Sequence, residues 1–390
     1  MRKIKHINFC CVLLLSFAWL FTACESEDEQ PPIPRDRVLL VYMGGDSDAK
    51  TSWEVTEKTN ALCAAWKNSL EGRLLIYQDD ASESPPRLLE IVAENGVNVQ
   101  KVLQTYEEEN SASKEVFARV IREVQALYPV SSYGLLLFSH ASGWLPEGRL
   151  TSPRSSGVDG RSIVIDGKDE GRNEMELVDF AAAIPDHTFD FIIFEACLMA
   201  GIEVAYELKD KTDYILASSA EIVSPGFTDI YEKLLHYLYE PTVNLAGFGK
   251  TAFNYINNLT GDARSSTLSL IKTSAVAPLV TYVHEHCDYS LANELSVYQN
   301  FYRSGYLFFD FGQYYTSLLG TQAEKGELSR LINDCVVWKA ATPTFMMGYG
   351  GFPIREHSGL TTYITQERYP VLNDAYAELS WQADFISESN

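Results

Sequence analysis

The sequence predicts an α/β fold built on a mainly parallel sheet that is sandwiched by helices. Short apolar runs alternate with helical stretches between residues 38 and 219. These runs are almost continuously apolar, which is typical of parallel strands buried on both faces. The chain has 390 residues, of which 46% are hydrophobic and 22% charged. This composition supports a large core and excludes the disordered, fibrous and polytopic membrane classes.

The elements follow one another in a regular order up to about residue 240. Strands are predicted at residues 38–43, 73–77, 134–140, 189–197 and 214–219, and helices at 53–70, 112–127, 174–183 and 198–208. Beyond residue 240 we expect helices at 243–258, 275–291 and 324–339, a strand at 267–271 and a β-rich tail at 345–364. We therefore predict a sheet domain at residues 38–240 and a C-terminal α+β subdomain at residues 241–390, packed on it.

The N-terminus has the pattern of a secretory signal. Arg2, Lys3 and Lys5 precede an apolar run at residues 9–21, and small residues then lead to Cys24. Residues 1–23 resemble a bacterial lipoprotein signal, which implies lipidation of Cys24; the alternative is an ordinary secretory peptide cleaved near Ala23.

Residues 24–37 form an acidic, proline-rich tether that cannot fold alone. This tether resembles the acidic tags that direct some bacterial lipoproteins to the cell surface. We expect an exported outer-membrane lipoprotein, attached to the membrane through Cys24 and exposed on the cell surface.

The net charge of the chain favours some classes of binding partner over others. Removing residues 1–23, which carry basic but no acidic residues, changes the formal net charge from −22 to −25. Nucleic acid is excluded because no basic surface is available to neutralise phosphates. A basic peptide or protein would instead be attracted.

Four cysteines remain after the signal and Cys24 are set aside, namely Cys63, Cys197, Cys287 and Cys335. Their spacings are too wide for a zinc ribbon, and no C-x-x-C pair occurs. Two disulfides are possible in an exported chain, although Cys63 lies in an apolar helical stretch where a buried free thiol is the favoured state. The disulfide state stays open.

Two predicted strands end on residues that can perform chemistry. One ends on Ser139-His140 and another on Glu195-Ala196-Cys197. Ligands of open α/β sheets bind beyond the carboxyl ends of the strands. A thiol between a strand and a following helix lies near the positive end of the helix dipole, which favours the thiolate. A histidine nearby would serve as its acid–base partner. By themselves these residues are also compatible with structural roles in the core.

Longer segments around these residues carry a family resemblance. The segments are Ser139-His140-Ala141-Ser142-Gly143-Trp144, Phe194-Glu195-Ala196-Cys197-Leu198-Met199-Ala200, Glu203-Val204-Ala205-Tyr206-Glu207-Leu208, Ser224-Pro225-Gly226 with Tyr231, and His357-Ser358-Gly359-Leu360-Thr361-Thr362-Tyr363. They resemble the clostripain family of cysteine peptidases, which shares the caspase-like fold. The resemblance extends over residues 38–385 and is strongest between residues 133 and 231.

The resemblance implies a role for several residues. Cys197 would be the nucleophile, His140 its acid–base partner, and backbone amides near Ala141, Ser142 and Cys197 the oxyanion hole. Ala141 and Ser142 replace two glycines of the family pattern, so a positive φ at Ala141 would strain the backbone.

The resemblance also implies cleavage after Arg or Lys. Glu195 stands where the family has an acid that helps to form the pocket, and residues two apart on a strand face the same side. Glu195 replaces the usual Asp, which makes the pocket shallower, and Asp229 is a candidate second acid. The alternative for Glu195 is a solvated or helix-capping carboxylate.

The segment 145–161 is rich in Gly, Pro and Ser. Long loops of this kind inside a compact domain are usually functional or disordered. In the family it is the region of self-cleavage, which makes Arg154, Arg149 and Arg161 candidate autocleavage sites. The alternative is an inert surface loop.

The sequence leaves three hypotheses for function. The first is a cysteine endopeptidase that cleaves after Arg or Lys and needs no cofactor or metal in its chemistry. Calcium, which some relatives require, could bind Asp46 and Asp48, although their spacing does not show a site. The second is a catalytically silent surface module that binds basic peptides. The third is an acyl-transfer enzyme with a non-peptide substrate.

Overall fold

The computed structural model describes residues 36–45, 49–80, 84–150, 153, 164 and 174–386. The predicted signal, Cys24 and most of the acidic tether lie outside these residues. The same holds for Asp46, Asp48, Arg154 and Arg161. No helix within the described ranges is both long and apolar enough to cross a membrane.

A nine-stranded sheet organises the described residues from 36 to 386, and its strand order is β10-β8-β7-β6-β5-β1-β2-β3-β4. The strands are β1 Arg37–Gly45, β2 Gly72–Asp80, β3 Arg87–Glu94, β4 Val97–Thr105, β5 Ser132–Phe138, β6 Phe189–Glu195, β7 Thr212–Ala217, β8 Thr267–Lys272 and β10 Val336–Ala341. The central pairings, from β2 through β1, β5 and β6 to β7, are parallel, whereas the outer pairings are antiparallel. The predicted fold class, a mainly parallel sheet with helices, is confirmed.

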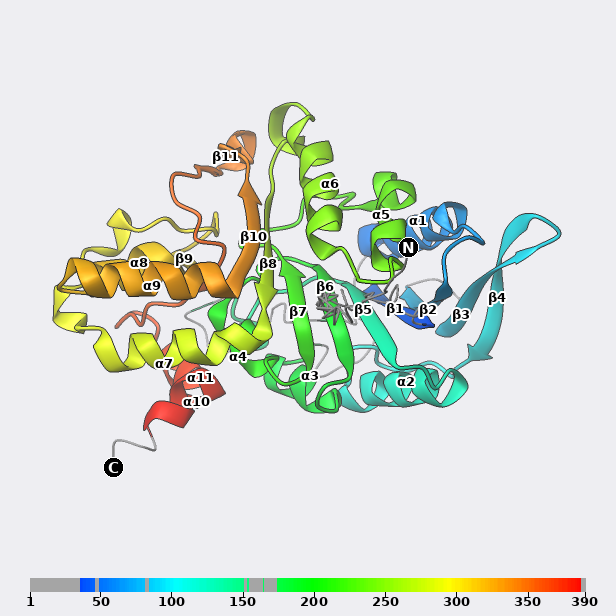
Figure 1. Cartoon of the computed structure of the whole chain (residues 1–390), viewed down its shortest axis with the longest axis horizontal. Coiled ribbons are helices and arrows are strands. Elements are labelled where there is room, and N and C mark those ends of the chain that lie inside the picture. The colour runs from blue at the N-terminus through cyan, green and yellow to red at the C-terminus, as the bar shows by residue number, and fades with distance from the viewer. Residues whose placement is uncertain are drawn as a thin grey trace, which may run out of the picture. The chain divides into compact units, whose positions relative to one another are not determined.

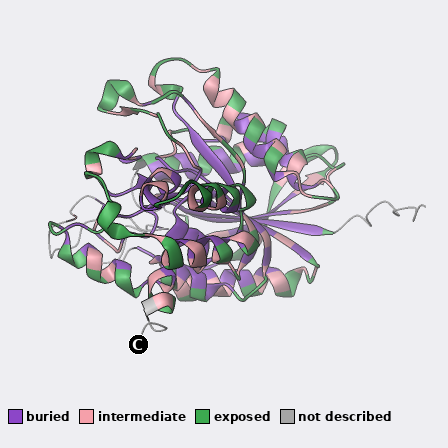
Figure 2. Ribbon diagram, turned by 60° about the vertical axis from the view of Figure 1, so that its left-hand side comes forward, coloured by how far each residue is buried: buried purple, intermediate pink, exposed green. Residues whose placement is uncertain are grey.

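Helices cover both faces of this sheet (Figure 1). One face carries α1 Ala49–Ala65, α5 Tyr231–Leu238 and α6 Leu245–Asn257, and the other carries α2 Lys114–Leu127, α3 Leu177–Ala183 and α4 Ile202–Glu207. Strand β1 contributes side chains to both layers. Leu39 and Val41 belong to the hydrophobic cluster on the side of α1, α5 and α6, and Leu40 and Tyr42 to the cluster on the side of α2, α3 and α4. Burying a large apolar side chain stabilises the fold by about 1.5–3 kcal/mol. The buried strands therefore hold the two layers together (Figure 2).

The second half of the chain completes the sheet. β8 pairs with β7, β10 pairs with β8, and the described residues from 36 to 386 form one compact unit. The expected boundary near residue 240 is therefore wrong, because strands from both sides of it share one sheet. The remaining elements are α7 Val276–His286, α8 Phe311–Ser317, α9 Gln322–Cys335, α10 Pro370–Glu378, α11 Ser380–Ile386, β9 Phe309–Asp310, β11 Thr344–Phe345, β12 Phe352–Pro353 and β13 Thr361–Thr362. Short 3₁₀ helices are η1 Thr228–Ile230, η2 Gly261–Ala263, η3 Thr273–Ala275, η4 Tyr289–Leu291, η5 Leu295–Val297 and η6 Met347–Tyr349.

A buried carboxylate ties the C-terminal segment to α4. Glu203 is fully buried, and its Oε1 accepts hydrogen bonds from the Tyr363 backbone N–H, the Thr362 hydroxyl and the Tyr376 hydroxyl. Just before α4, the carbonyl of Ala200 accepts a hydrogen bond from the Thr361 backbone N–H at 2.9 Å. The loop that follows Cys197 is thus anchored to β13 and α10.

The Glu203 side chain makes stability depend on pH. Burial raises the pKa of Glu203 to about 7 from 4.5, although its hydrogen bonds act in the opposite direction. Because the folded protein then holds this proton more tightly than the unfolded chain, the free energy of unfolding falls as pH rises from about 4.5 to about 7. The loss attributable to Glu203 is up to about 3 kcal/mol. The denaturant midpoint of wild type should therefore exceed that of Glu203→Gln by more at pH 5 than at pH 7.5. An equal difference at the two pH values would contradict this assignment.

Candidate active site

The sheet register brings His140 and Cys197 together. β5 and β6 are adjacent parallel strands, and Phe138 at the end of β5 is paired with Glu195 at the end of β6. His140 and Cys197 each lie two residues beyond this pair. Neighbouring strands lie about 4.8 Å apart, so the two side chains leave the sheet at equivalent positions. Both are partly exposed and line the same cavity, of about 630 Å³.

The backbone at Cys197 differs from the prediction of a helix that begins at Leu198. α4 begins only at Ile202, so the thiol is not at a helix N-terminus and the helix-dipole argument is wrong. Leu198 instead has φ +65°, and its N–H donates to the carbonyl of Ala220 at 3.0 Å. A left-handed conformation at a residue other than Gly costs about 1–3 kcal/mol and occurs often at functional sites.

A backbone N–H, with its partial positive charge, lies at the sulfur in place of a helix N-terminus. The backbone N–H of Ile222 points at Sγ of Cys197, with a distance of 3.3 Å from nitrogen to sulfur. A hydrogen bond to the charged form of a group favours that form. This contact therefore favours the thiolate of Cys197.

His140 is held from helix α1. The Thr51 hydroxyl lies 2.9 Å from Nε2 of His140, and the tautomer decides which of the two atoms donates. One residue earlier, the Ser139 hydroxyl donates to the carbonyl of Gly44 at 2.7 Å, which ties the end of β5 to the end of β1. No sequence signal marked Thr51, because its position opposite His140 arises only when α1 packs over the sheet.

The predicted oxyanion residues lie beside the cavity. Ala141 and Ser142 are buried, and neither is among the residues that line it. The positive φ of this segment is at Gly143, where φ is +65° and a Cβ would meet the carbonyl oxygen of Leu198 at 2.7 Å. The strain expected at Ala141 therefore does not arise. Which amides serve as oxyanion donors stays a prediction.

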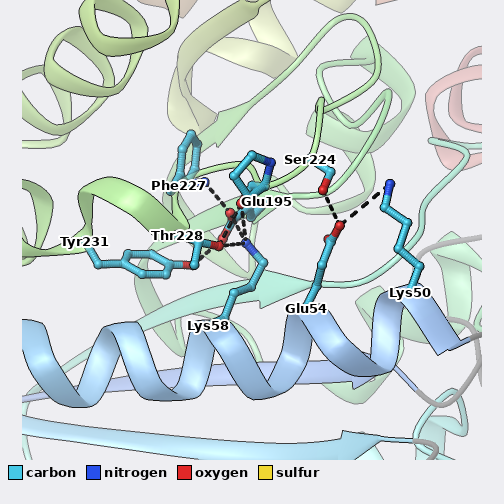
Figure 3. Close-up of polar contacts among 9 residues, drawn as sticks. Lys50, Glu54, Lys58, Glu195, Ser224, Phe227, Thr228 and Tyr231 are labelled. Atoms are coloured by element: carbon cyan, nitrogen blue, oxygen red, sulfur yellow. Dashed lines mark hydrogen bonds and ion pairs between the residues drawn. The ribbon is translucent and has the colours of Figure 1, made fainter. Parts of the chain in front are cut away.

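Glu195 lines the cavity together with Cys197, but its carboxylate already has partners. Its side chain is fully buried, and Oε1 accepts a hydrogen bond from Nζ of Lys58 at 2.5 Å. The Phe227 backbone N–H donates to the same oxygen at 2.6 Å, and the Tyr231 hydroxyl donates to Oε2. Glu195 is thus neither solvated nor a helix cap, and it is engaged by a lysine of the same chain (Figure 3).

Asp229 does not supply a second acid to this cavity. It lies in η1, is exposed, and is absent from the residues that line the cavity. Its Oδ2 accepts a hydrogen bond from the Tyr255 hydroxyl at 3.1 Å on the protein surface. The prediction fails because the η1 turn directs Asp229 toward α6.

Sequence reasoning missed other charged groups of the cavity. Glu54 on α1 accepts a hydrogen bond from the Ser224 hydroxyl, and Nζ of Lys50 lies 3.8 Å from its Oε1 (Figure 3). Across the cavity, Arg303 donates to both carboxylate oxygens of Glu221, at 2.7 and 2.9 Å. These residues lie far apart in the sequence, and no local pattern identified them.

The other cysteines are unsuited to nucleophilic catalysis. None of the four cysteines of the described residues is in a disulfide in this structure. Burial raises the pKa of Cys287 and of Cys335 to about 12 and also raises that of Cys63. Because the thiolate is the nucleophile, a raised pKa disfavours the reactive form of these three thiols at neutral pH. Among the described residues, no group of three or more His, Cys, Asp or Glu side chains could hold a metal ion.

The family model of the clostripain family matches residues 41–339. The chain belongs to the clostripain family. Clostripain from Hathewaya histolytica is 28% identical over 137 residues, which is 33% of this chain and 24% of clostripain. The matched segment thus spans about a quarter of that relative's length.

Solved structures of clostripain-family proteins extend over nearly the whole chain. An inactive zymogen of a C11 protease from Parabacteroides distasonis is 30% identical, covers 91% of this chain and 99% of its own, and has a TM-score of 0.77. A secreted C11 cysteine protease from Bacteroides thetaiotaomicron, in complex with an irreversible peptide inhibitor, is 24% identical, with coverages of 90% and 99% and a TM-score of 0.76. At that identity the second likeness shows the fold alone. The predicted family and its caspase-like fold are confirmed.

Proposed function

We propose that the chain is a cysteine endopeptidase in which Cys197 is the nucleophile and His140 the general acid–base. The observation that carries this proposal is the shared cavity at the ends of β5 and β6, where the register places both side chains. Membership of the clostripain family supports the reaction class. A nucleophile and a base delivered by neighbouring strands are the minimum that acyl transfer requires.

The reaction divides into two steps. The Cys197 thiolate attacks the scissile carbonyl carbon, and its charge passes to the carbonyl oxygen, which backbone amides stabilise. His140 in its protonated form gives its proton to the leaving amine, which leaves an acyl-enzyme on Sγ. Neutral His140 then takes a proton from water, which hydrolyses the thioester and restores the thiolate. The Thr51 hydroxyl holds the His140 ring during both steps.

A preference for Arg or Lys before the scissile bond is the least supported part of the prediction. It requires a carboxylate that can face a substrate cation, whereas each acidic side chain of the cavity already has a partner. The pairs are Glu195 with Lys58, Glu221 with Arg303, Glu54 with Ser224 and Lys50, and Asp262 with the N–H of Gly348. A binding module for basic peptides would need the same carboxylates. We therefore propose the peptidase chemistry without a basic requirement.

The direct experiment is digestion of a denatured protein substrate by the mature chain, followed by mass spectrometry of the products. New peptide termini should form with wild type and be absent with Cys197→Ala. Binding of peptides without any cleavage would favour a silent module, and turnover of small esters alone would favour an acyl-transfer enzyme.

Self-cleavage within residues 145–161 is expected to produce two fragments on a denaturing gel. The relative from Parabacteroides distasonis is described as an inactive zymogen, which supports a processing step in this family. Arg149 is partly buried and does not line the cavity, while Arg154 and Arg161 lie outside the described residues. Cys197→Ala should give a single band, and a single band for wild type as well would refute self-cleavage. N-terminal sequencing of the smaller fragments identifies the bond.

We also propose that the mature chain is exported and anchored through a lipid at Cys24. The support is the sequence pattern of residues 1–24. Mass spectrometry of the mature protein should show an acylated Cys24 at the N-terminus. An unmodified N-terminus at another residue would exclude the lipoprotein.

A further inference from the structure

A lysine of helix α1 occupies the position that a basic substrate side chain would need. The Lys58 side chain is fully buried, and its Nζ donates to Oε1 of Glu195 at 2.5 Å, to the Thr228 hydroxyl at 2.9 Å and to the carbonyl of Pro225 at 3.0 Å (Figure 3). An ammonium has three donors, and all three are used here. The ring of Phe138 lies 4.4 Å from Nζ and adds a cation–π contact.

The walls of this site fit the lysine closely. Gly226, with φ +64°, lies against the Glu195 carboxylate, so that a Cβ at this position would meet Oε1 at 2.2 Å. The Phe227 N–H and the Tyr231 hydroxyl occupy further positions around the same carboxylate. Glu195, Gly226 and Lys58 all line the cavity that holds Cys197. The site is therefore a built cation pocket beside the nucleophile, and its cation belongs to the protein.

We propose that Lys58 permanently occupies the primary specificity pocket, so that the enzyme selects an uncharged side chain before the scissile bond. This inference rests on the proposed peptidase function. A second cation at Glu195 would place two positive charges against one carboxylate in a buried site, which is unfavourable because buried charges need individual partners. Near Cys197 the cavity presents uncharged side chains, including Thr51, Ala196 and Val223.

Of the other three acidic side chains of the cavity, Glu54 and Glu221 each have a cation of the chain nearby, and Asp262 accepts a hydrogen bond from the Gly348 N–H. Lys50 lies near Glu54, and Arg303 is bound to Glu221 through two hydrogen bonds. A substrate guanidinium would therefore have to compete with a resident cation at Glu54 or Glu221 as well. Lys58 differs from these cations because it is the one paired with Glu195, two positions from the nucleophile.

The test compares matched peptides that differ only in the residue before the scissile bond, with lysine, arginine, norleucine or glutamine there. Norleucine has the four-carbon side chain of lysine without the terminal ammonium. For wild type we expect a kcat/KM for norleucine at least about tenfold above that for lysine, since a tenfold ratio needs only one modest interaction. A wild-type preference for lysine or arginine would overturn the proposal, and this comparison needs no variant to fold.

Variants identify the residue responsible. Lys58→Ala exposes the Glu195 carboxylate to substrate and should raise the lysine-to-norleucine ratio of kcat/KM by at least about tenfold. Lys58→Ala/Glu195→Gln, which lacks the carboxylate, should show no such gain. Lys67→Ala is the matched control, because Lys67 follows the same helix but is exposed and outside the cavity. An unchanged ratio in Lys58→Ala would overturn the proposal.

A binding measurement separates this inference from the proposed reaction. In the Cys197→Ala background, n-butylammonium chloride mimics the lysine side chain and needs no catalysis. We expect it to raise the Tm of Cys197→Ala/Lys58→Ala, because the ligand refills the cation pocket, and to leave the Tm of Cys197→Ala unchanged. Equal behaviour of the two proteins would overturn the occupancy of the pocket by Lys58. Absence of all hydrolysis in wild type, with the expected Tm shift present, would reject the peptidase instead.

Discussion

Replacing Cys197 by alanine is expected to reduce kcat for peptide hydrolysis by a factor on the order of 10⁴ or more, because no acyl-enzyme can form without the sulfur. The neighbouring groups that bind substrate would remain. KM should therefore change far less than kcat. The measurement is initial rates with a peptide that the wild type cleaves.

Replacing His140 should have an effect of similar size, since the thiolate and its proton donor act as a unit. The double variant should be scarcely slower than either single variant, because effects within a catalytic unit are not additive. Cys63→Ala is the control, since Cys63 lies in α1, outside the cavity. Wild-type rates in Cys197→Ala, or a large loss in Cys63→Ala, would contradict the assignment of the nucleophile.

Replacing Lys58 by methionine is expected to lower the free energy of unfolding by about 3–5 kcal/mol, the usual cost of breaking a buried ion pair from one side. The Glu195 carboxylate would keep its contacts to Phe227 and Tyr231 but lose its only cation within the described residues. Lys58→Met/Glu195→Gln removes both charges and should recover most of this loss. The coupling energy follows from the denaturant unfolding curves of wild type, Lys58→Met, Glu195→Gln and Lys58→Met/Glu195→Gln.

An exposed ion pair provides the comparison for this cycle. Lys211 pairs with Asp186, whose side chain is 64% exposed, and pairs of this kind contribute little to stability. Lys211→Met should therefore shift the midpoint far less than Lys58→Met. If Lys58→Met were as stable as Lys211→Met, the ammonium of Lys58 would not be buried against Glu195 in solution.

The sequence was sufficient to predict the central strands of the sheet, although β5 and β6 end two residues before the predicted ends. The continuous apolar runs before His140 and Cys197 correspond to β5 and β6, because parallel strands buried on both faces need such runs. The register between the two strands was not predictable. It depends on packing of both layers, although it is what places the two residues side by side.

Other features had a local signal that pattern reading overlooked. The hairpin of β3 and β4 turns at Asn95-Gly96, where φ is +52° and +80°. An Asn-Gly pair between apolar segments is a strong hairpin signal because both residues tolerate positive φ. A signal was also present at residues 336–338, where two valines and a tryptophan favour the strand β10 over a continued helix.

The charge arrangement of the site had no local signal. Lys58 lies on a predicted helix, where a lysine is normally solvated, and its partner Glu195 is 137 residues away. Glu195 and Cys197 both line the cavity, as their two-residue spacing suggests, although β6 ends at Glu195. Its engagement by Lys58 depends on how α1 packs over β6. For that reason the positions of His140 and Cys197 were easier to predict than the charge arrangement around Glu195.

Alkylation by iodoacetamide at neutral pH, followed by peptide mass spectrometry, tests the role of Cys197 most directly. We predict that Cys197 is modified first, that activity is lost in parallel, and that Cys63, Cys287 and Cys335, whose pKa values burial raises, remain unmodified. His140→Ala should slow the modification of Cys197. Loss of activity while Cys197 stays intact, or modification of Cys197 no faster than that of the other three, would contradict its role as the nucleophile.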